Sequence, residues 1–261
     1  AGLGETGGGF AQVGDTGGLT FALPLWAACH ERCLGASIPS VARFRINSMD
    51  ATTPPEPTLN SLDTLSARLQ NYKPRRIPGR SLVARCGVIL LLAEHGADGR
   101  DIAPALLLMR RAERVGDPWS GHVSFPGGRV DHSDTSTRAA ALRELQEETG
   151  ISAYNDLVAI GRLSDVLTRE HGRNRPMVVS PFVYRTPRAL VLEPSREAAK
   201  LWWEPIAHLA DPERRRPLVW RVAGLPLRFS SVDVSDARLW GLSLMMVDEL
   251  IRVTGSKAPI A

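Results

Sequence analysis

Three glutamates lie close together in a segment of the chain that lacks Gly and Pro. Glu144, Glu147 and Glu148 occupy positions i, i+3 and i+4 within residues 135–149. On an α-helix, at about 100° per residue, these positions share one arc, so three like charges converge where they repel each other. Mg²⁺ or Mn²⁺, which favour oxygen ligands, would compensate for that repulsion. The spacing predicts a helix that carries a metal site, with a solvated acidic helix face as the alternative.

The residues around this segment favour the metal site. Asp134 is a suitable N-cap, and Gly150 stands where a left-handed C-cap is expected. Leu142 and Leu145 lie on a different face from the glutamates. We therefore expect the helix to pack through its leucines, with the carboxylates open to substrate. Upstream, residues 126–128 read Pro-Gly-Gly, which lets the backbone approach a ligand closely.

These residues resemble the Nudix box, Gly-x5-Glu-x7-Arg-Glu-U-x-Glu-Glu-x-Gly-U, in which U is aliphatic. The second half of the pattern matches residues 143–151 at every defined position. In the first half, Asp134 stands where the family has Glu, and one extra residue separates it from Arg143. The chain is thereby identified as similar to the Nudix hydrolase superfamily.

Two further segments look like the coenzyme A pyrophosphatase branch of that superfamily. They are residues 123–128, Val-Ser-Phe-Pro-Gly-Gly, and residues 240–243, Trp-Gly-Leu-Ser. One segment departs from the branch. Where the branch usually has an Arg- and His-containing stretch that ends in Gly-Gln, residues 116–122 read Gly-Asp-Pro-Trp-Ser-Gly-His.

The resemblance implies an α/β fold, an α/β/α sandwich with a mixed β-sheet, over about residues 80–255. It also implies metal-dependent hydrolysis of the pyrophosphate bond in a nucleoside diphosphate linked to another moiety. Coenzyme A or acyl-coenzyme A is the first choice of substrate, giving adenosine 3′,5′-bisphosphate and 4′-phosphopantetheine or its acyl form. The alternatives are another Nudix substrate, such as ADP-ribose, NADH or a dinucleotide, and a non-catalytic module that senses nucleotides.

The resemblance also assigns roles to individual residues. Glu144, Glu147 and Glu148 are expected to bind Mg²⁺ or Mn²⁺, together with the backbone carbonyl of Gly127. Glu147 is alternatively the group that takes a proton from the attacking water. Arg143 cannot bind a cation, so its expected role is a fork-like salt bridge that holds a carboxylate, or a purely structural one.

Candidates outside the box are less specific. Glu170, in a polar stretch, is a second candidate for the general base, although a mobile, solvated loop is the alternative. Arg110 and Arg111 follow an apolar run and are candidates for contacts with substrate phosphates. We expect a structural role for His122. Core packing, rather than base stacking, is the expectation for the tryptophans that we considered, Trp202, Trp203, Trp220 and Trp240.

Composition limits the partners. The 261 residues carry a net charge of +4, which favours an anionic small molecule. The basic residues are scattered and aromatic content is 6%, so we expect no nucleic-acid partner. Apolar runs fall short of the roughly 18 residues of a membrane span, so we expect no membrane partner. Three cysteines are typical of a reducing compartment, hence a cytoplasmic location. A homodimer remains open.

The chain divides into four parts by pattern. Residues 1–48 are expected to be a disordered extension and residues 256–261 a tail. Residues 49–79 are expected to form a linker with a short helix at 59–71, and residues 80–255 the Nudix domain. Strands are expected at 82–93, 105–110, 121–125, 157–163, 178–184 and 200–203, a short helix or turn at 205–209, and a helix at 239–253.

Overall fold

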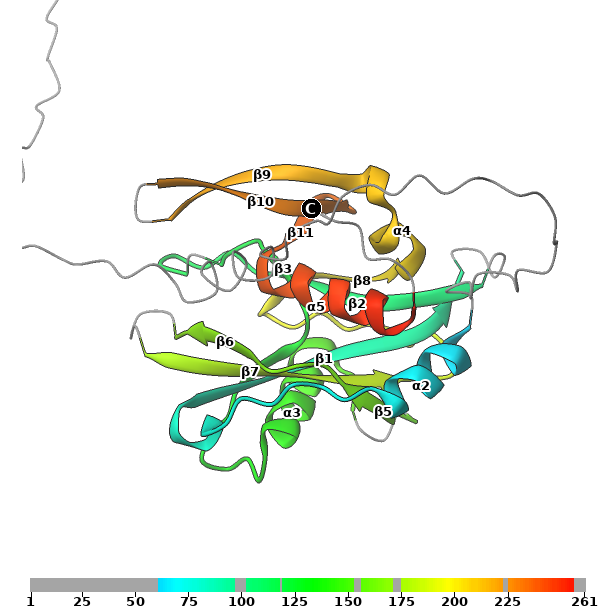
Figure 1. Ribbon diagram of the computed structural model, residues 1–261, viewed down its shortest axis with the longest axis horizontal. Coiled ribbons are helices and arrows are strands. Elements are labelled where there is room, and N and C mark those ends of the chain that lie inside the picture. Colours follow the sequence, from blue (N-terminus) through cyan, green and yellow to red (C-terminus); the bar gives the residue numbers. More distant parts are fainter. Residues whose placement is uncertain are drawn as a thin grey trace, which may run out of the picture.

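The computed structural model describes residues 61–96, 102–117, 119–152, 156–170, 175–222 and 225–255. A mixed sheet forms its centre, with α3 on one face and α2, α4, α5 and a smaller sheet on the other (Figure 1). The expected α/β/α sandwich is confirmed. The extension predicted at 1–48 and the tail at 256–261 lie outside the described residues.

The large sheet has eight strands in the described part of the chain, and the smaller sheet has three. The strands of the large sheet are β1 (Ala84–His95), β2 (Ala103–Arg111), β3 (Val123–Ser124), β4 (Gly127–Arg129), β5 (Val158–Arg162), β6 (Val166–Arg169), β7 (Pro176–Arg185) and β8 (Ala198–Pro205). The smaller sheet consists of β9 (Arg215–Val222), β10 (Leu225–Val234) and β11 (Ala237–Trp240). The helices are α2 (Leu62–Asn71), α3 (Thr137–Thr149), α4 (Ile206–Ala210) and α5 (Gly241–Val253), with 3₁₀ turns at Arg80–Leu82 and Pro212–Arg214.

Strand β1 is central because both of its faces are apolar. It pairs in parallel with β7 and antiparallel with β2 and β4. Leu90 and Leu92 pack on the side of α2 and α5, whereas Ile89 and Leu91 pack on the side of α3. All four are fully buried, as expected for a strand covered on both faces. This strand divides the core into two layers.

Helix α3 begins and ends at short-range signals. The hydroxyl of Ser136 accepts the Ala139 N–H at 3.1 Å, and Gly150 closes the helix with φ of 74°. Ser136 is therefore the N-cap, and the prediction of Asp134 was wrong. The carboxylate of Asp134 is taken instead by Arg143, at 3.2 and 3.1 Å. A long-range ion pair thus displaces the local cap.

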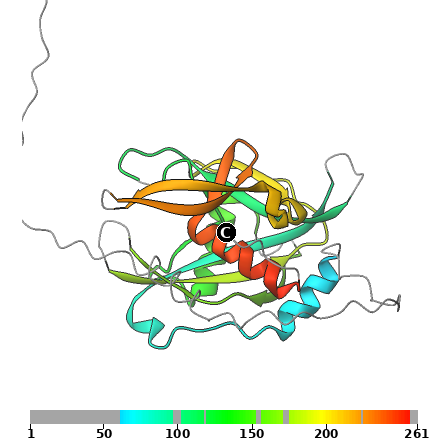
Figure 2. The ribbon, with the colours of Figure 1, turned by 45° about the horizontal axis from the view of Figure 1, so that its top comes forward.

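Helix α2 is part of the packed domain. Leu62, Leu65 and Leu69 are buried in the same core layer as α5, and Figure 2 shows the two helices side by side. The helix expected at 59–71 is therefore present. Among the described residues, no helix combines the length and the apolar composition needed to cross a membrane.

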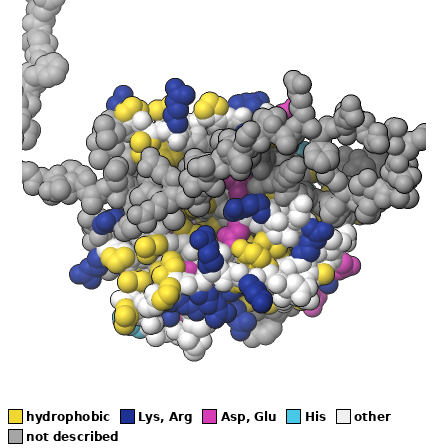
Figure 3. All heavy atoms as spheres, viewed as in Figure 1, with side chains coloured by type: hydrophobic (Ala, Val, Ile, Leu, Met, Phe, Trp, Pro, Cys, Tyr) yellow, Lys and Arg dark blue, Asp and Glu magenta, His cyan; other side chains and the backbone are white. Residues whose placement is uncertain are grey.

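The smaller sheet was not anticipated. Residues 237–240 pair with β10, so the helix expected from residue 239 begins at Gly241. The hairpin of β9 and β10 projects over the face that carries α5 (Figure 1). Over the face shown in Figure 3, basic side chains are spread out, with acidic ones between them.

Candidate active site

A glycine turn brings the backbone against α3. Gly127 has φ of 150°, and a Cβ there would lie 2.3 Å from the carbonyl oxygen of Gly87 in β1. A Cβ on Gly128 would lie 2.3 Å from Oε1 of Glu144. Each contact is too close for any other residue to be accommodated without movement. The two glycines therefore let the turn and the Glu144 carboxylate touch.

Glu148 lies beneath this turn. Its side chain is buried, with 2% of the residue exposed, and its Oε2 accepts the Gly127 N–H at 2.9 Å. The pKa of Glu148 is raised to about 7, chiefly by burial and also by the charge of Glu144, while the Gly127 N–H and the charge of Arg111 oppose the shift. The expectation that the carboxylates stay open was wrong for Glu148, because it packs under the turn to reach its donor.

The other two glutamates differ from each other. Burial also raises the pKa of Glu144, although the adjacent guanidinium of Arg143 opposes the shift. The side chain of Glu147 is 57% exposed and forms an ion pair with Arg143 at 3.0 Å. Within the described ranges, no three His, Cys, Asp or Glu side chains converge closely enough to hold a metal ion by themselves. The turn therefore gathers two carboxylates, those of Glu144 and Glu148.

Arg143 forms the expected fork-like salt bridge. Its Nε and Nη2 donate to the two oxygens of Asp134, and its Nη1 lies 3.0 Å from carboxylate oxygens of both Glu144 and Glu147. Nη2 also donates to the carbonyl of Arg129, at 3.3 Å. The hydrogen bonds from Arg143 lower the pKa of Asp134 below its ordinary value. This guanidinium fixes the start of α3 and the end of the turn relative to each other.

The two arginines at the end of β2 are separated. Nη1 of Arg110 pairs with Asp236, in the connection between β10 and β11, at 2.9 Å. Nη2 of Arg111 pairs with Asp117 at 2.9 Å, and its charge lowers the pKa of Glu148. Of the two candidates for phosphate contacts, Arg111 is the one whose charge acts on Glu148, whereas Arg110 pairs with the smaller sheet.

Glu170 lies near the turn as well. Its Oε1 is 2.5 Å from Nη1 of Arg129, the residue after Gly128, and its side chain is only 7% exposed. The interpretation of this residue as part of a solvated loop was therefore wrong, since the ion pair draws it inwards. Both candidates for the general base therefore pair with an arginine of this region. Glu170 is buried and pairs with Arg129, and Glu147 is exposed and pairs with Arg143.

Comparison with known proteins shows which family shares this site. The model of the NUDIX domain matches residues 83–221, which include the glycine turn and all of α3. The chain belongs to the Nudix family. Its membership agrees with the layered fold and with the position of the two carboxylates on a helix beside a glycine turn.

Individual Nudix relatives are similar over different lengths. The uncharacterized Nudix hydrolase NudL of Escherichia coli is 38% identical over 200 residues, 76% of this chain and 96% of that protein. The peroxisomal coenzyme A diphosphatase of Caenorhabditis elegans is 30% identical over 126 residues, 48% of this chain and 50% of that protein. Other curated relatives are covered over only 34% and 44% of their length. A MutT/nudix family protein from Enterococcus faecalis has a TM-score of 0.40 at 16% identity, covering 69% of this chain and 58% of that one.

Two further charged residues, Arg114 and Glu197, were not predicted from the sequence. Arg114 pairs with Glu197, just before β8, at 2.9 Å. The charge of Glu197 raises the pKa of both Glu144 and Glu148, and the N–H of Ser195, two residues before Glu197, donates to the backbone carbonyl of Glu148 at 3.3 Å. The two residues are 83 positions apart in the numbering, so no local pattern reports their pairing.

The tryptophans that we considered divide into two groups. Nε1 of Trp203 donates to the carbonyl of Leu190, and the ring is buried, as expected of a core residue. Trp202 is partly buried against the core. Trp220 and Trp240 instead pack with the ring of His122, between the loop after β2 and the smaller sheet. The predicted structural role of His122 agrees with its position among these rings.

Proposed function

We propose that this protein is a metal-dependent hydrolase that cleaves the pyrophosphate bond of a nucleoside diphosphate linked to another moiety. One observation carries the proposal: two carboxylates of α3, the buried Glu148 and the partly buried Glu144, meet at the backbone of Gly127 and Gly128. Their mutual repulsion and their burial both favour a bound cation. Arg143 already pairs with Glu144, whereas the buried Glu148 accepts a backbone N–H rather than a guanidinium.

The donor set fits Mg²⁺ or Mn²⁺. Such ions prefer oxygen ligands and are usually held by one or two carboxylates, waters and substrate phosphates rather than by an all-protein cage. Glu144, Glu148 and the carbonyl of Gly127 would supply the protein ligands, with Glu147 as a further candidate. When bound, the ion would offset phosphate charge and lower the pKa of a coordinated water.

The other residues of the site would orient the metal ligands, bind the substrate phosphates and accept a proton from the attacking water. Arg143 holds Glu144 and Asp134 in place, so it acts as a positioning residue for the ligand set. Arg111, whose charge lowers the pKa of Glu148, is the candidate for a phosphate oxygen. Glu147 and Glu170 remain the two candidates to accept the proton of the attacking water, because each lies beside the turn or the helix.

Coenzyme A or an acyl derivative is our first choice of substrate. The Val-Ser-Phe-Pro-Gly-Gly segment at 123–128 and the Trp-Gly-Leu-Ser segment at 240–243 support it, as does the similarity to the worm coenzyme A diphosphatase. The products would be adenosine 3′,5′-bisphosphate and 4′-phosphopantetheine or its acyl form. ADP-ribose, NADH or a dinucleotide is the alternative. The retained glutamates of the box favour an enzyme over a nucleotide-sensing module.

A substrate panel tests the proposal directly. The full chain is incubated with Mg²⁺ or Mn²⁺ and coenzyme A, 3′-dephospho-coenzyme A, NADH, ADP-ribose or diadenosine tetraphosphate, and products are identified by mass. We expect two phosphomonoester products from coenzyme A, formed about 100-fold or more slowly by the Glu148→Gln variant, which is the matched control. Brisk cleavage of another compound without cleavage of coenzyme A would exclude the coenzyme A assignment. No cleavage of any compound would exclude the hydrolase.

Recognition of the 3′-phosphate is tested by the same panel. Arg111 is our candidate for a basic group near the ribose, and loss of one charged contact corresponds to about 1.5–3 kcal/mol. We therefore expect 3′-dephospho-coenzyme A to have a kcat/KM about tenfold or more below that of coenzyme A. Arg111→Gln should remove that difference between the two substrates, whereas Arg110→Gln should preserve it.

A further inference from the structure

Five aromatic rings form one cluster between the loop after β2 and the smaller sheet. The ring centroid of His122 lies 5.5 Å from that of Trp119, 5.4 Å from Trp220 and 5.3 Å from Trp240. Phe229 is 5.7 Å from Trp240. These distances are those of stacked and edge-to-face pairs, so the rings support each other. We call these five residues the aromatic cluster.

Trp119 is the outer member of the aromatic cluster. It is 44% exposed, whereas the other four residues are partly buried. An isolated exposed aromatic residue needs no explanation, but this indole packs edge-to-face with the ring of His122, which in turn packs on Trp220 and Trp240, and its backbone N–H is held by Asp117. A large ring held in one place offers a contact surface at a low cost in conformational entropy.

A carboxylate connects Trp119 to the Nudix site. Oδ1 of Asp117 accepts the backbone N–H of Trp119 at 2.9 Å, and Oδ2 accepts Nη2 of Arg111 at 2.9 Å. Arg111 is the arginine whose charge acts on Glu148. The position of the indole is therefore coupled, through one side chain, to the candidate phosphate-binding guanidinium.

The loop that carries Trp119 is closed on itself. The Ser120 hydroxyl accepts the N–H of Arg114 and donates to the carbonyl of Arg114, both at 2.9 Å. The N–H of His122 donates to the carbonyl of Trp119 at 3.2 Å. Arg114 itself pairs with Glu197 beside the carboxylates. Both ends of this loop are thus anchored around the indole before any ligand arrives.

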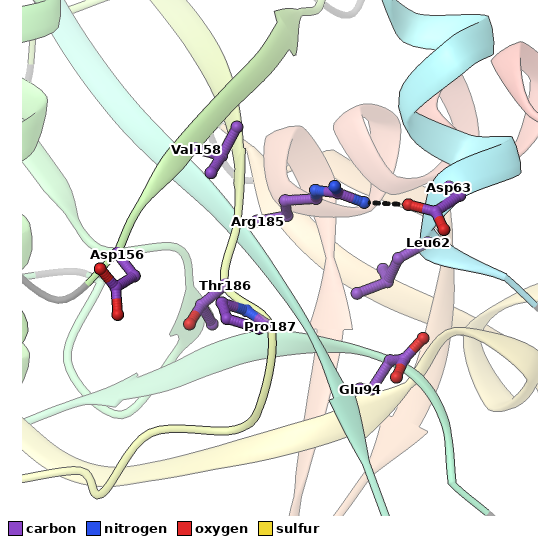
Figure 4. Close-up of a pocket in the computed structure, with 8 residues that line it drawn as sticks. All are labelled: Leu62, Asp63, Glu94, Asp156, Val158, Arg185, Thr186 and Pro187. Atoms are coloured by element: carbon purple, nitrogen blue, oxygen red, sulfur yellow. Dashed lines mark hydrogen bonds and ion pairs between the residues drawn. The ribbon is translucent and has the colours of Figure 1, made fainter.

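A separate pocket offers poorer chemistry for a nucleotide. Its volume is about 330 Å³, and it lies between α2, the start of β5 and the ends of β1 and β7 (Figure 4). Asp63, Glu94 and Asp156 line it, with Arg185 as the basic residue among those drawn. Its one basic group is already paired with Asp63. Carboxylates repel an anionic ligand, so this pocket does not suit a phosphate ester.

We propose that the indole of Trp119 is the platform on which the nucleobase of the substrate stacks, with Arg111 beside it for the phosphates. The inference rests on the proposed hydrolase and deepens it, since it assigns the ligand moiety that the aromatic cluster recognises. A planar base and a planar indole match in shape and polarisability, and stacking of this kind tolerates any base. Trp119 is then a substrate-binding residue that contributes to KM rather than to the chemical step.

Two ligands that differ only in the nucleoside isolate this contact. ADP and inorganic pyrophosphate share two phosphates, and ADP adds the adenosine, whose base is the group expected to stack. Their affinities are measured by calorimetry with the full chain, for the wild type and for Trp119→Phe, Trp119→Leu and Trp119→Ala. Phe keeps a planar ring, and Leu keeps apolar bulk without one. We expect wild type and Trp119→Phe to bind ADP at least tenfold more tightly than Trp119→Leu does, with equal affinity for pyrophosphate.

Kinetics supply the second measurement. With whichever nucleoside diphosphate derivative the wild type cleaves, Trp119→Leu should raise KM about tenfold and leave kcat within twofold. Equal ADP affinity in wild type and Trp119→Leu would overturn the platform, even if hydrolysis is normal. If Trp119→Leu lost affinity for pyrophosphate as well as for ADP, the platform would also be overturned, because Trp119 would then maintain the structure of the site rather than contact the base. Absence of hydrolysis in the wild type, with ring-dependent ADP binding intact, would overturn the hydrolase and retain the platform.

Discussion

Two carboxylates of this protein are almost equally buried, but their pKa values are shifted in opposite directions. Glu148 of α3 is 2% exposed, and Asp165, between β5 and β6, is 8% exposed. Burial raises the pKa of Glu148 to about 7. Burial also acts to raise the pKa of Asp165, yet the hydrogen bonds from Ser180 and the Ile77 N–H, together with Arg162 and Arg80, outweigh it, and the pKa is lowered.

The number of donors explains the difference. Oδ1 of Asp165 accepts the Ser180 hydroxyl at 2.7 Å and pairs with Arg162, and Oδ2 accepts the Ile77 N–H and Nη1 of Arg80, both at 3.1 Å. For Glu148 the described residues show one donor, the Gly127 N–H. A buried charge with a complete set of donors is a structural element, whereas one with a single donor favours a cation. Burial alone therefore does not distinguish the two classes.

Replacement of Asp165 should give the largest effect on stability. Asp165→Asn keeps the shape of the side chain but leaves the guanidiniums of Arg162 and Arg80 without their counter-charge. The expected loss in free energy of unfolding is about 3–5 kcal/mol, measured by urea denaturation. The control is Asp233→Asn, which breaks an exposed pair with Arg238 and should cost less than about 1 kcal/mol. A loss at Asp165 as small as the control would contradict the structural assignment.

The same variant has a defined pH dependence. The folded-state pKa of Asp165 lies below its ordinary value of 3.8. The stability that it contributes is therefore complete above that value and is lost as the pH falls through the folded-state pKa. The difference in unfolding free energy between wild type and Asp165→Asn should be constant near neutral pH and should shrink below about pH 4. A difference that grows as the pH falls would have the wrong sign.

Replacement of Glu148 should separate function from stability. Glu148→Gln can still accept the Gly127 N–H, but it removes the buried charge and a proposed metal ligand. We expect kcat to fall about 100-fold or more, equivalent to about 2.7 kcal/mol. The unfolding free energy of the metal-free variant should equal or exceed that of the wild type, because no charge is left buried. If stability fell as in Asp165→Asn, the distinction between the two carboxylates would be lost.

Arg143→Lys should have an intermediate effect. Lysine keeps the charge but cannot donate to both oxygens of Asp134 while also reaching Glu144. Positioning residues of this kind are associated with changes of about 10–100-fold, and we expect about tenfold in kcat/KM. Titration of activity with Mn²⁺ provides the check, since the variant should need more metal for half-maximal rate. An unchanged metal requirement would leave Arg143 with a purely structural role.

Local patterns explain what the sequence could predict. Helix α3, its glycine C-cap and the adjacent turn follow from residues within a few positions of each other, and all were anticipated. Asp134 failed as an N-cap because Arg143, nine residues away, binds its carboxylate. Glu147, which was expected to join the other two carboxylates, is largely exposed and pairs with the same guanidinium.

Long-range pairing explains what the sequence could not predict. The strands β9 and β10 contain Pro217 and Pro226 and several arginines, which hide the alternation typical of a strand. The pairing of Arg114 with Glu197 joins residues 83 positions apart, so it depends on the assembled sheet. Such contacts leave no periodic signal in the chain.

The smallest effect on stability and activity is expected from removal of residues 1–48. A chain that begins at Met49 should retain the full free energy of unfolding and kcat/KM, because residues 1–48 offer little periodic apolar surface. A chain that begins at Lys73 is the matched contrast. It lacks α2, whose Leu62, Leu65 and Leu69 are buried, each at about 1.5–3 kcal/mol. Urea denaturation of both chains, with the rate on the substrate of the wild type, locates the boundary. Destabilisation of the Met49 chain would show that the residues before it contribute to the fold. A Lys73 chain as stable as the full chain would show that α2 does not contribute to the stability of the domain.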